Sequence, residues 1–409
     1  MTSRRGPRSW HSRQGDRPAA SPDRSLLALI FALVTCAIAT IYITQPVLPI
    51  LEAQFGVSPA TASLSVSAVI IGMAVSTLPV GVLADRYPAR RLMIIGACAV
   101  AGAGLVCATT SRFPTLVAMR GVQGAFIPML TTVVATWLSR SLPTRALNVA
   151  MGTYVSATVA GGLGGRLLAG WAFAPSHWRD AFFTVAFALV IVALLVAMRI
   201  VDPPHGNVRT TAHIPFVRLV ARRPQVLAQA AAFGAFGAFS TAFNYFPFYL
   251  STPPWSFSTP TITSLYLAYV AGLASGPIAG RLANRFGNGV VMSVGAVIIA
   301  VALLASLIKM MAVLVVSLVV LCIGFFAVHA AAIGGLNRAL SGERGKANAL
   351  YTLFYYLGGA AGIAAGGNAY ARFGWPGIVG VCLALSLLPF CMGIIAWREG
   401  SRTTRVSTS

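Results

Sequence analysis

The sequence predicts an all-α membrane protein with twelve transmembrane helices in two six-helix halves. Composition, the spacing of apolar stretches and an internal repeat all predict it. Of the 409 residues, 57% are hydrophobic and only 9% are charged, whereas a soluble domain carries about 25% charged residues. A bilayer is the solvent that such a composition needs, because apolar helices cross it with their backbone groups already hydrogen-bonded.

The apolar stretches fall between residues 25 and 397, and each is long enough to cross the hydrocarbon core. The first runs from Ser25 to Leu51, which is too long for the apolar part of a signal peptide, so we expect it to be retained. The predicted divisions are a disordered basic cytoplasmic tail at 1–24, an N-terminal half at 25–200, a cytoplasmic linker at 201–224, a C-terminal half at 225–397 and a cytoplasmic tail at 398–409.

The basic residues predict the orientation. With the N-terminus inside, 24 of the 30 Lys and Arg residues fall in cytoplasmic segments and four fall in external ones. Basic residues concentrate in cytoplasmic loops of inner-membrane proteins. We therefore expect a multi-pass protein of the bacterial inner membrane with both termini in the cytoplasm. The same distribution accounts for the net charge of +22, so no nucleic-acid partner is expected.

The two halves repeat in sequence. Residues 81–87 (GVLADRY) recur as residues 280–286 (GRLANRF), an offset of 199 positions. A second match has an offset of 197, in which Gly161, Gly162 and Gly165 recur as Gly358, Gly359 and Gly362. Parallel repeats related by an axis along the membrane normal place a solute site at their interface, near the bilayer midplane.

Three segments resemble motifs of the major facilitator superfamily. Residues 81–91 (GVLADRYPARR) resemble its loop motif between helices two and three, although Pro88 stands where the family usually has Gly. Residues 120–124 (RGVQG) are similar to its fourth-helix motif, and residues 161–165 (GGLGG) to the fifth-helix motif of its antiporter branch. The resemblance covers about residues 25–397. Within the family, the chain resembles bacterial inner-membrane efflux proteins of the arabinose-efflux or drug–proton antiporter type.

The resemblance implies the major facilitator fold and proton-coupled efflux of a small solute by alternating access. A metabolite importer or facilitator on the same fold is the alternative, and a non-transporting membrane sensor is a third hypothesis. The sequence has no GxxxxGK[ST] phosphate-binding loop and no catalytic or metal-ligating constellation. We therefore expect neither an enzyme nor a bound cofactor or metal. The expected partners are membrane lipids, the small-molecule substrate and protons, and the expected state is a monomer.

The resemblance assigns a gating role to the 81–91 segment. Asp85 is expected to bond across the interface between the halves and close the cytoplasmic side in the outward-facing state. Alternatively, the arginines of the segment only fix the topology. Asn284 takes the place of Asp85 in the second copy and cannot form an ion pair, so the two gates should differ in strength. The other members of this predicted gating motif are Gly81, Arg86, Arg90 and Arg91.

Polar residues inside the predicted spans are the next candidates, because such residues normally face the bundle interior. The resemblance makes Arg120 a proton-coupling or substrate-contacting residue, with a structural arginine bonded to helix-end carbonyls as the alternative. Gln123 lies one turn further on and is expected to orient Arg120. His329 could carry a proton, since histidine titrates near neutral pH, or be a packing residue. Arg166 is expected to snorkel to the outer interface or pair with Asp180, with substrate contact as the alternative.

Other candidates lie on spans that line the cavity in the family. They are Tyr42, Gln45, Asn244, Tyr245, Tyr355 and Tyr356. For the tyrosines, anchoring at the membrane interface is the alternative. Gly161, Gly162 and Gly165 are expected to let helices pack closely. All eight acids fall outside the middle of the predicted spans. A cationic solute would therefore find no buried counter-charge, and we expect an anionic or neutral polar solute.

Overall fold

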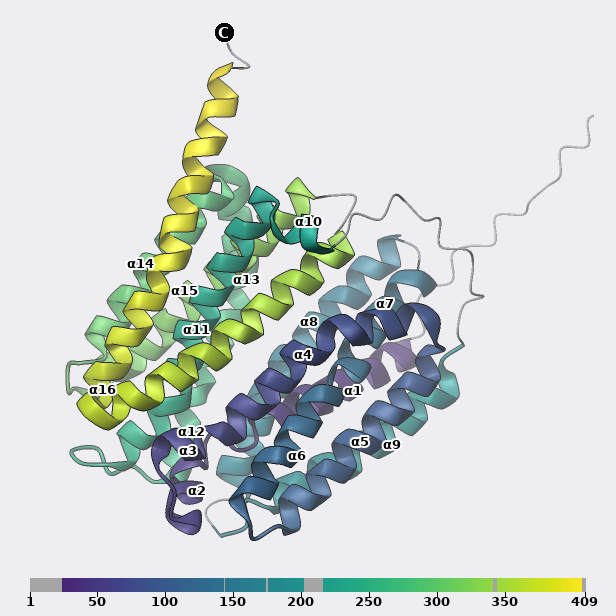
Figure 1. Ribbon diagram of the computed structural model, residues 1–409, viewed down its shortest axis with the longest axis vertical. Coiled ribbons are helices and arrows are strands. Elements are labelled where there is room, and N and C mark those ends of the chain that lie inside the picture. The colour runs from purple at the N-terminus through teal and green to yellow at the C-terminus, as the bar shows by residue number, and fades with distance from the viewer. Residues whose placement is uncertain (1–23, 143, 174–175, 202–215, 341–343, 407–409) are drawn as a thin grey trace, which may run out of the picture.

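The computed structural model describes residues 24–142, 144–173, 176–201, 216–340 and 344–406. Regular secondary structure in these ranges is helical throughout. Figure 1 shows two groups of long helices lying side by side, one formed by residues 24–201 and the other by residues 216–406. The predicted tail at 1–24, apart from Arg24, and most of the predicted linker at 201–224 lie outside the described residues.

The first group contains the helices that precede the predicted linker. In order they are α1 (Arg24–Tyr42), α2 (Leu48–Phe55), α3 (Pro59–Ala62), α4 (Leu64–Arg86), α5 (Ala89–Thr109), α6 (Phe113–Phe126), α7 (Pro128–Ser141), α8 (Thr144–Leu167), the π-helical turn η1 (Leu168–Ala172) and α9 (Asp180–Arg199).

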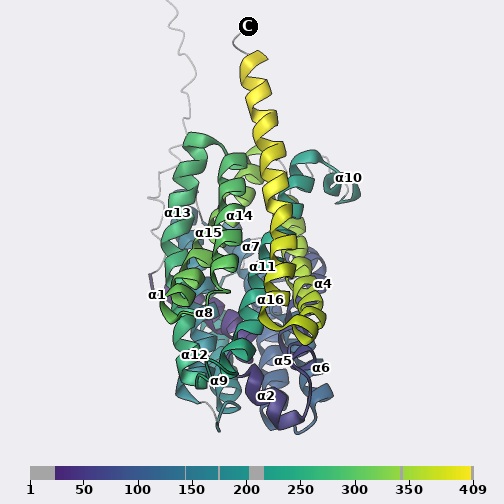
Figure 2. The ribbon, with the colours of Figure 1, turned by 90° about the vertical axis from the view of Figure 1, so that its left-hand side faces the viewer.

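The second group contains the helices that follow it. In order they are α10 (Phe216–Val220), α11 (Arg223–Ser251), α12 (Thr259–Leu265), the 3-10 turn η2 (Tyr266–Ala268), α13 (Tyr269–Phe286), α14 (Asn288–Ala305), α15 (Met311–Ala339) and α16 (Arg344–Val406). Figure 2 shows the same bundle edge-on, with the last arm of α16 extending beyond the other helices.

The helices account for the predicted membrane spans. Ten helical stretches among the described residues are long and apolar enough to cross a membrane. One of them, α16, turns at Gly374, where φ is +59°. Only glycine adopts such a conformation readily, so α16 supplies two arms. The glycine-rich α8 adds a helix of 24 residues, long enough to span. Each of the twelve predicted spans thus has a helical counterpart.

One predicted boundary is wrong. The first span was expected to continue to Leu51, but α1 ends at Tyr42 and residues 43–47 form turns before α2 begins. Pro46 lies in this break, and proline cannot donate the backbone hydrogen bond that a continuous helix requires. The break brings Gln45 into the bundle interior, where it is buried.

The repeated glycines pack each half in the same way. A Cβ atom added at Gly161 or Gly165 would collide with the backbone of α1 at Thr35 or Ala39. In the second half, a Cβ at Gly358 or Gly362 would collide with the backbone of α11. Small residues allow this close approach in membranes. The packing role predicted for Gly161 and Gly165 matches this geometry, and the repeat extends from the sequence to the helix contacts.

The fully buried part of the apolar core is shared between the groups mainly toward one end. We call the end that carries Arg86, Arg140 and Arg199 the basic end, which lies at the top of Figure 1, and the other the opposite end. One buried cluster joins the two groups and includes Leu51, Phe243 and the other residues around α2, α11 and α12. Two further clusters have buried members from only one group each. The halves therefore pack most continuously toward the opposite end.

Candidate functional site

A cavity of about 340 Å³ lies between the two halves. Helices α1, α7 and α8 contribute one wall, and α11, α13, α15 and α16 contribute the other. The lining residues used below are Tyr42, Gly162, Arg166, Phe236, Phe239, Tyr269, Phe325, Phe326, His329, Tyr351, Tyr355 and Tyr356. This position is the one that the parallel repeat predicts for a solute site.

Arg166 is the charged group of this cavity. Its side chain is 1% exposed, and its Nε donates to Gln45 Oε1 at 2.6 Å. Nη2 donates to the Tyr269 hydroxyl at 2.8 Å, and Nη1 donates to the Gly162 carbonyl. Arg166 therefore ties α8 to the α1–α2 break in its own half and to α13 in the other half.

Aromatic rings surround this guanidinium. Its Cζ lies 3.8 Å from the ring centre of Tyr42, 4.4 Å from that of Tyr269 and 5.1 Å from that of Tyr266. The negative ring faces attract a cation, more strongly where water is excluded. These contacts offset part of the cost of burying the charge.

Sequence reasoning misjudged Arg166. It neither reaches an outer interface nor pairs with Asp180, which instead lies 3.7 Å from His177. The reason is the α1–α2 break, which supplies Gln45 as a partner inside the bundle and removes any need to snorkel. The sequence signal that pointed to a buried role was an arginine inside a predicted span that contains no acidic residue.

The far wall of the cavity is a stack of aromatic rings. Phe239 stacks on Phe325 with ring centres 4.0 Å apart, and Phe236 stacks on Tyr355 at 3.7 Å. Tyr356 meets Tyr355 edge to face at 5.3 Å. The cavity thus combines a cation on one side with flat apolar surfaces on the other, from two different halves.

His329 lies on the same far wall. Its Nδ1 is 2.9 Å from the Tyr351 hydroxyl, and its ring lies 5.4 Å from that of Tyr355. It is the one histidine among the residues that line the cavity. Its position fits the predicted proton carrier, and the hydrogen bond to Tyr351 equally fits the packing alternative, so the role stays a prediction.

Hydrogen bonds close the cavity on the side of the opposite end. Trp171 Nε1 in η1 donates to the Pro260 carbonyl at 3.0 Å and to Ser264 Oγ at 3.2 Å, both in α12. Asn244 Nδ2 in α11 donates to Ser63 Oγ, between α3 and α4, at 2.7 Å. Together with the Arg166–Tyr269 bond, these contacts join the two halves below the cavity.

Comparisons with known proteins identify the family. The sequence profile of the Major Facilitator Superfamily matches residues 30–276 and 257–407. The chain belongs to the Major Facilitator Superfamily. The inner membrane transport protein YnfM of Escherichia coli (strain K12) is 30% identical over 387 residues, which cover 93% of this chain and 91% of YnfM.

Two further proteins extend the comparison. An uncharacterized MFS-type transporter, YybF of Bacillus subtilis (strain 168), is 25% identical over 381 residues, covering 92% of this chain and 93% of YybF. The crystal structure of a bacterial homolog of the human lysosomal transporter Spinster, in an inward-facing and unoccupied conformation, superposes with a TM-score of 0.74 at 17% identity. It covers 93% of this chain and 98% of that one, which confirms the major facilitator fold. The protein is thus a membrane transporter of this superfamily.

The predicted cavity residues of this transporter divide into two sets. Tyr42, Tyr355 and Tyr356 line the cavity, and Gln45 lies behind Arg166 as its hydrogen-bond partner. Asn244 and Tyr245 are buried outside the lining.

Their partners explain the separation. The Tyr245 hydroxyl donates to the Ile363 carbonyl at 3.0 Å, while Asn244 bonds to Ser63 and its Oδ1 has no partner among the described residues. Asn244 therefore belongs to the closure between the halves, whereas the Tyr245 hydrogen bond lies within the C-terminal half.

Arg120, from the fourth-helix motif, is held by the protein backbone. Nε donates to the Ser65 carbonyl at 2.8 Å, while Nη1 and Nη2 donate to the carbonyls of Thr40 and Ile41 at 2.6 and 2.5 Å. Nη1 also donates to Gln123 Oε1 at 2.8 Å, the contact expected of Gln123. Arg120 is fully buried and lies outside the cavity lining. This geometry favours the structural alternative, and the coupling role stays a prediction.

Asp85, in the predicted gating motif, pairs within its own half. Its Oδ1 lies 2.5 Å from Nη2 of Arg140 at the end of α7. The second half repeats the pair: Arg338 donates to Asn284 Oδ1 at 2.7 Å and also to Asn288. Asp85, Arg140 and their counterparts in the second half are exposed, as are Arg86, Arg90 and Arg91. Gly81 has open space beside it. The bond across the halves expected of Asp85 belongs to a different state and stays untested.

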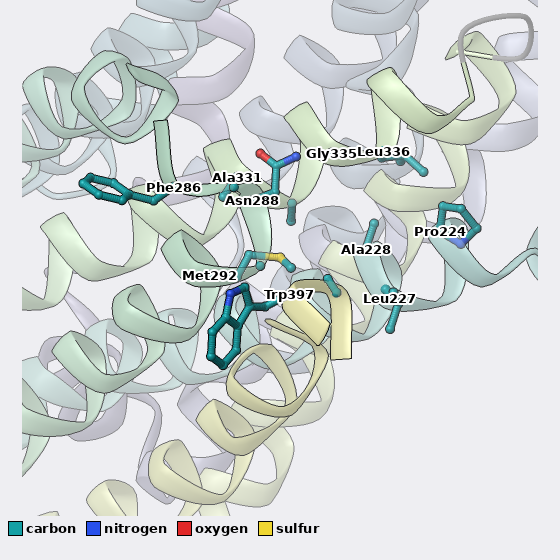
Figure 3. Close-up of a pocket in the computed structure, with 14 residues that line it drawn as sticks. Pro224, Leu227, Ala228, Phe286, Asn288, Met292, Ala331, Gly335, Leu336 and Trp397 are labelled. Carbon is teal, nitrogen blue, oxygen red and sulfur yellow. The ribbon is translucent and has the colours of Figure 1, made fainter. Parts of the chain in front are cut away.

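A second cavity, of about 490 Å³, lies inside the C-terminal half at the basic end. Figure 3 shows it between α11, α14, α15 and α16, with Met292, Trp397 and Leu227 among its apolar lining. Asn288 contributes an amide side chain to the lining of this cavity. That side chain accepts a hydrogen bond from Arg338. Because one half encloses this cavity, it does not lie on a path between the halves.

Proposed function

We propose that this protein is a secondary active transporter of the bacterial inner membrane that exports a small solute in exchange for protons. Both termini lie in the cytoplasm in this proposal, so the basic end faces the cytoplasm. The observation that carries it is the cavity between the halves, with Arg166 and His329 in its lining and hydrogen-bonded closure toward the opposite end. The resemblance to efflux proteins supports the direction.

Alternating access follows from which contacts can break. Opening toward the opposite end requires loss of the Trp171–Ser264 hydrogen bond, which is exposed, and of the Asn244–Ser63 hydrogen bond, which is buried. The glycine-packed contacts within each half are continuous and resist separation. The halves therefore rock as units about the cavity. Closure at the basic end then uses the 81–91 segment, where Asp85 exchanges Arg140 for a partner in the other half.

The proton step is assigned to His329. Histidine is the residue type whose unperturbed pKa lies closest to neutral pH, and His329 is the one histidine among the described residues that line the cavity. No carboxylate takes that place in the lining. A proton on the imidazole adds a second positive charge to a cavity that already contains Arg166. Proton and solute occupancy are thereby linked through electrostatics.

The test is transport by purified protein in vesicles of defined orientation. An imposed pH gradient should drive solute out of the compartment that corresponds to the cytoplasm, and collapse of the gradient should stop accumulation. Solute movement in the same direction as protons would indicate the importer instead. Ligand binding without any flux would favour a sensor.

A cross-link tests the closure directly. The Trp171→Cys/Ser264→Cys double variant can be joined across η1 and α12 by a short, reducible thiol-reactive cross-linker, and the cross-link should stop transport until it is reduced. Each single variant, treated with the same cross-linker, is the matched control for the native cysteines. Full transport by the cross-linked protein would contradict alternating access at this interface.

A further inference from the structure

Arg166 is a buried cation that has no anionic partner among the described residues. The four acids in the described residues have other surroundings: Asp85 pairs with Arg140, Asp180 lies beside His177, Glu399 pairs with Arg223, and Glu52 lies in α2. A buried charge is costly unless it is paired. The hydrogen bonds and ring faces around Arg166 are all provided by neutral groups. The cavity therefore keeps a net positive charge.

The guanidinium also has unused hydrogen-bonding capacity. Arginine carries five N–H groups in a planar fork. Three of them donate to Gln45, Gly162 and Tyr269, and the Tyr42 hydroxyl also lies within hydrogen-bond reach of the guanidinium. A solute carboxylate that takes the place of the Tyr42 hydroxyl can accept from the remaining N–H groups of the two terminal nitrogens, because arginine binds carboxylates bidentately. Arg166 lines the cavity, so these donors are the ones that a bound solute can meet.

The opposite wall selects the rest of the solute. Phe236, Phe239, Phe325 and Tyr355 present stacked ring faces and edges. Aromatic rings gain from offset or edge-to-face contact beyond their area burial. A cavity of about 340 Å³ accepts one small ring and its substituents.

We propose that the solute is a small aromatic carboxylate, bound with its carboxylate on Arg166 and its ring against the aromatic wall of α11, α15 and α16. This inference rests on the proposed function. Binding in this position spans both halves, because Arg166 belongs to the first and the ring wall to the second. A solute bound there would therefore contact both halves at once. Aromatic cations are rejected, because Arg166 repels them and the lining holds no acid.

Four probes, the fourth being benzylammonium, separate the contributions of charge and aromatic ring in the detergent-purified full chain. Benzoate carries both features, benzamide is its neutral counterpart of similar shape, and cyclohexanecarboxylate keeps the charge without the aromatic ring. Titration calorimetry at pH 7 should give benzoate an affinity about tenfold or more above that of benzamide, since a charged hydrogen-bonded pair is lost. Cyclohexanecarboxylate should fall between them, and benzylammonium should not bind. Equal binding of benzoate and benzamide, or tighter binding of benzylammonium, would overturn the proposal.

Variants assign the effect to one residue. Arg166→Gln should remove the preference for benzoate over benzamide, and Arg166→Lys should keep part of it. Arg112→Gln removes an exposed charge outside the cavity and should leave the preference unchanged. If an Arg166 variant fails to fold, the ranking of the probes on the unaltered chain still decides the proposal.

The same experiment keeps the two proposals apart. Arg166-dependent benzoate binding without proton-driven flux would contradict the proposed transport and leave the site assignment intact. Proton exchange with some other solute, in a chain that does not bind benzoate, would contradict the assigned solute class and leave the transporter intact.

Discussion

His329 and Tyr351 meet on the cavity wall, with Nδ1 and the phenol oxygen 2.9 Å apart. The two residues come from α15 and α16, so the bond joins neighbouring helices of the C-terminal half. A hydrogen-bonded partner fixes the ring orientation of a histidine and the nitrogen that exchanges a proton. The pair is therefore the place in the cavity to test the proposed proton transfer.

Replacement of His329 tests this role. His329→Gln keeps a polar side chain but cannot titrate, so we expect solute accumulation driven by a pH gradient to fall at least about tenfold. Solute counterflow without a gradient should persist. Tyr351→Phe removes only the hydrogen bond and should have a smaller effect. Unimpaired accumulation in His329→Gln would make His329 a packing residue.

Arg120 offers a test that separates structure from coupling. Arg120→Ala leaves the carbonyls of Thr40, Ile41 and Ser65 without their donor, and buried hydrogen bonds to a charged group contribute about 1.5–3 kcal/mol each. We expect transport to be abolished together with a clear drop in the unfolding temperature in detergent. Loss of transport with an unchanged unfolding temperature would instead support the coupling role.

Asp85 should affect turnover more than stability. Its ion pair with Arg140 is exposed, and pairs of that kind contribute about 0–1 kcal/mol. We therefore expect Asp85→Ala to slow transport severalfold while solute affinity and unfolding temperature stay nearly constant. Arg140→Ala is the matched variant, because it breaks the same pair but leaves the carboxylate free to act across the halves. Identical turnover in Asp85→Ala and the unaltered protein would remove the gate assignment.

Two neighbouring glycines in α8 provide a steric test. A Cβ at Gly165 would meet the backbone of Ala39 in α1, whereas a Cβ at Gly164 has open space. Gly165→Ala should therefore destabilise the protein by about 1–3 kcal/mol, seen as a lower unfolding temperature. Gly164→Ala should be neutral or slightly stabilising, because alanine favours a helix. The reverse order of effects would contradict the α1–α8 packing.

Much of the fold could be predicted because hydrophobic length is a local property. Apolar stretches of sufficient length become spans, and the recurring glycines predicted packing that the structure repeats in α8 and α16. The end of α1 at Tyr42 escaped prediction, because the apolar residues on both sides of Pro46 conceal the break. The Arg338–Asn284 counterpart of the Asp85–Arg140 pair also escaped, since each pair joins helices that are distant in sequence.

By itself, the sequence determined that a lipid bilayer surrounds the chain, and it determined the number of spans, the repeat and the superfamily. The tertiary structure decided which buried arginine meets the solute cavity. Arg120 and Arg166 give the same local signal, a cation within an apolar helix, because hydropathy reports depth and not direction. Folding placed three backbone carbonyls around Arg120 and left Arg166 facing aromatic rings from the other half. Only contacts between distant segments can make that distinction.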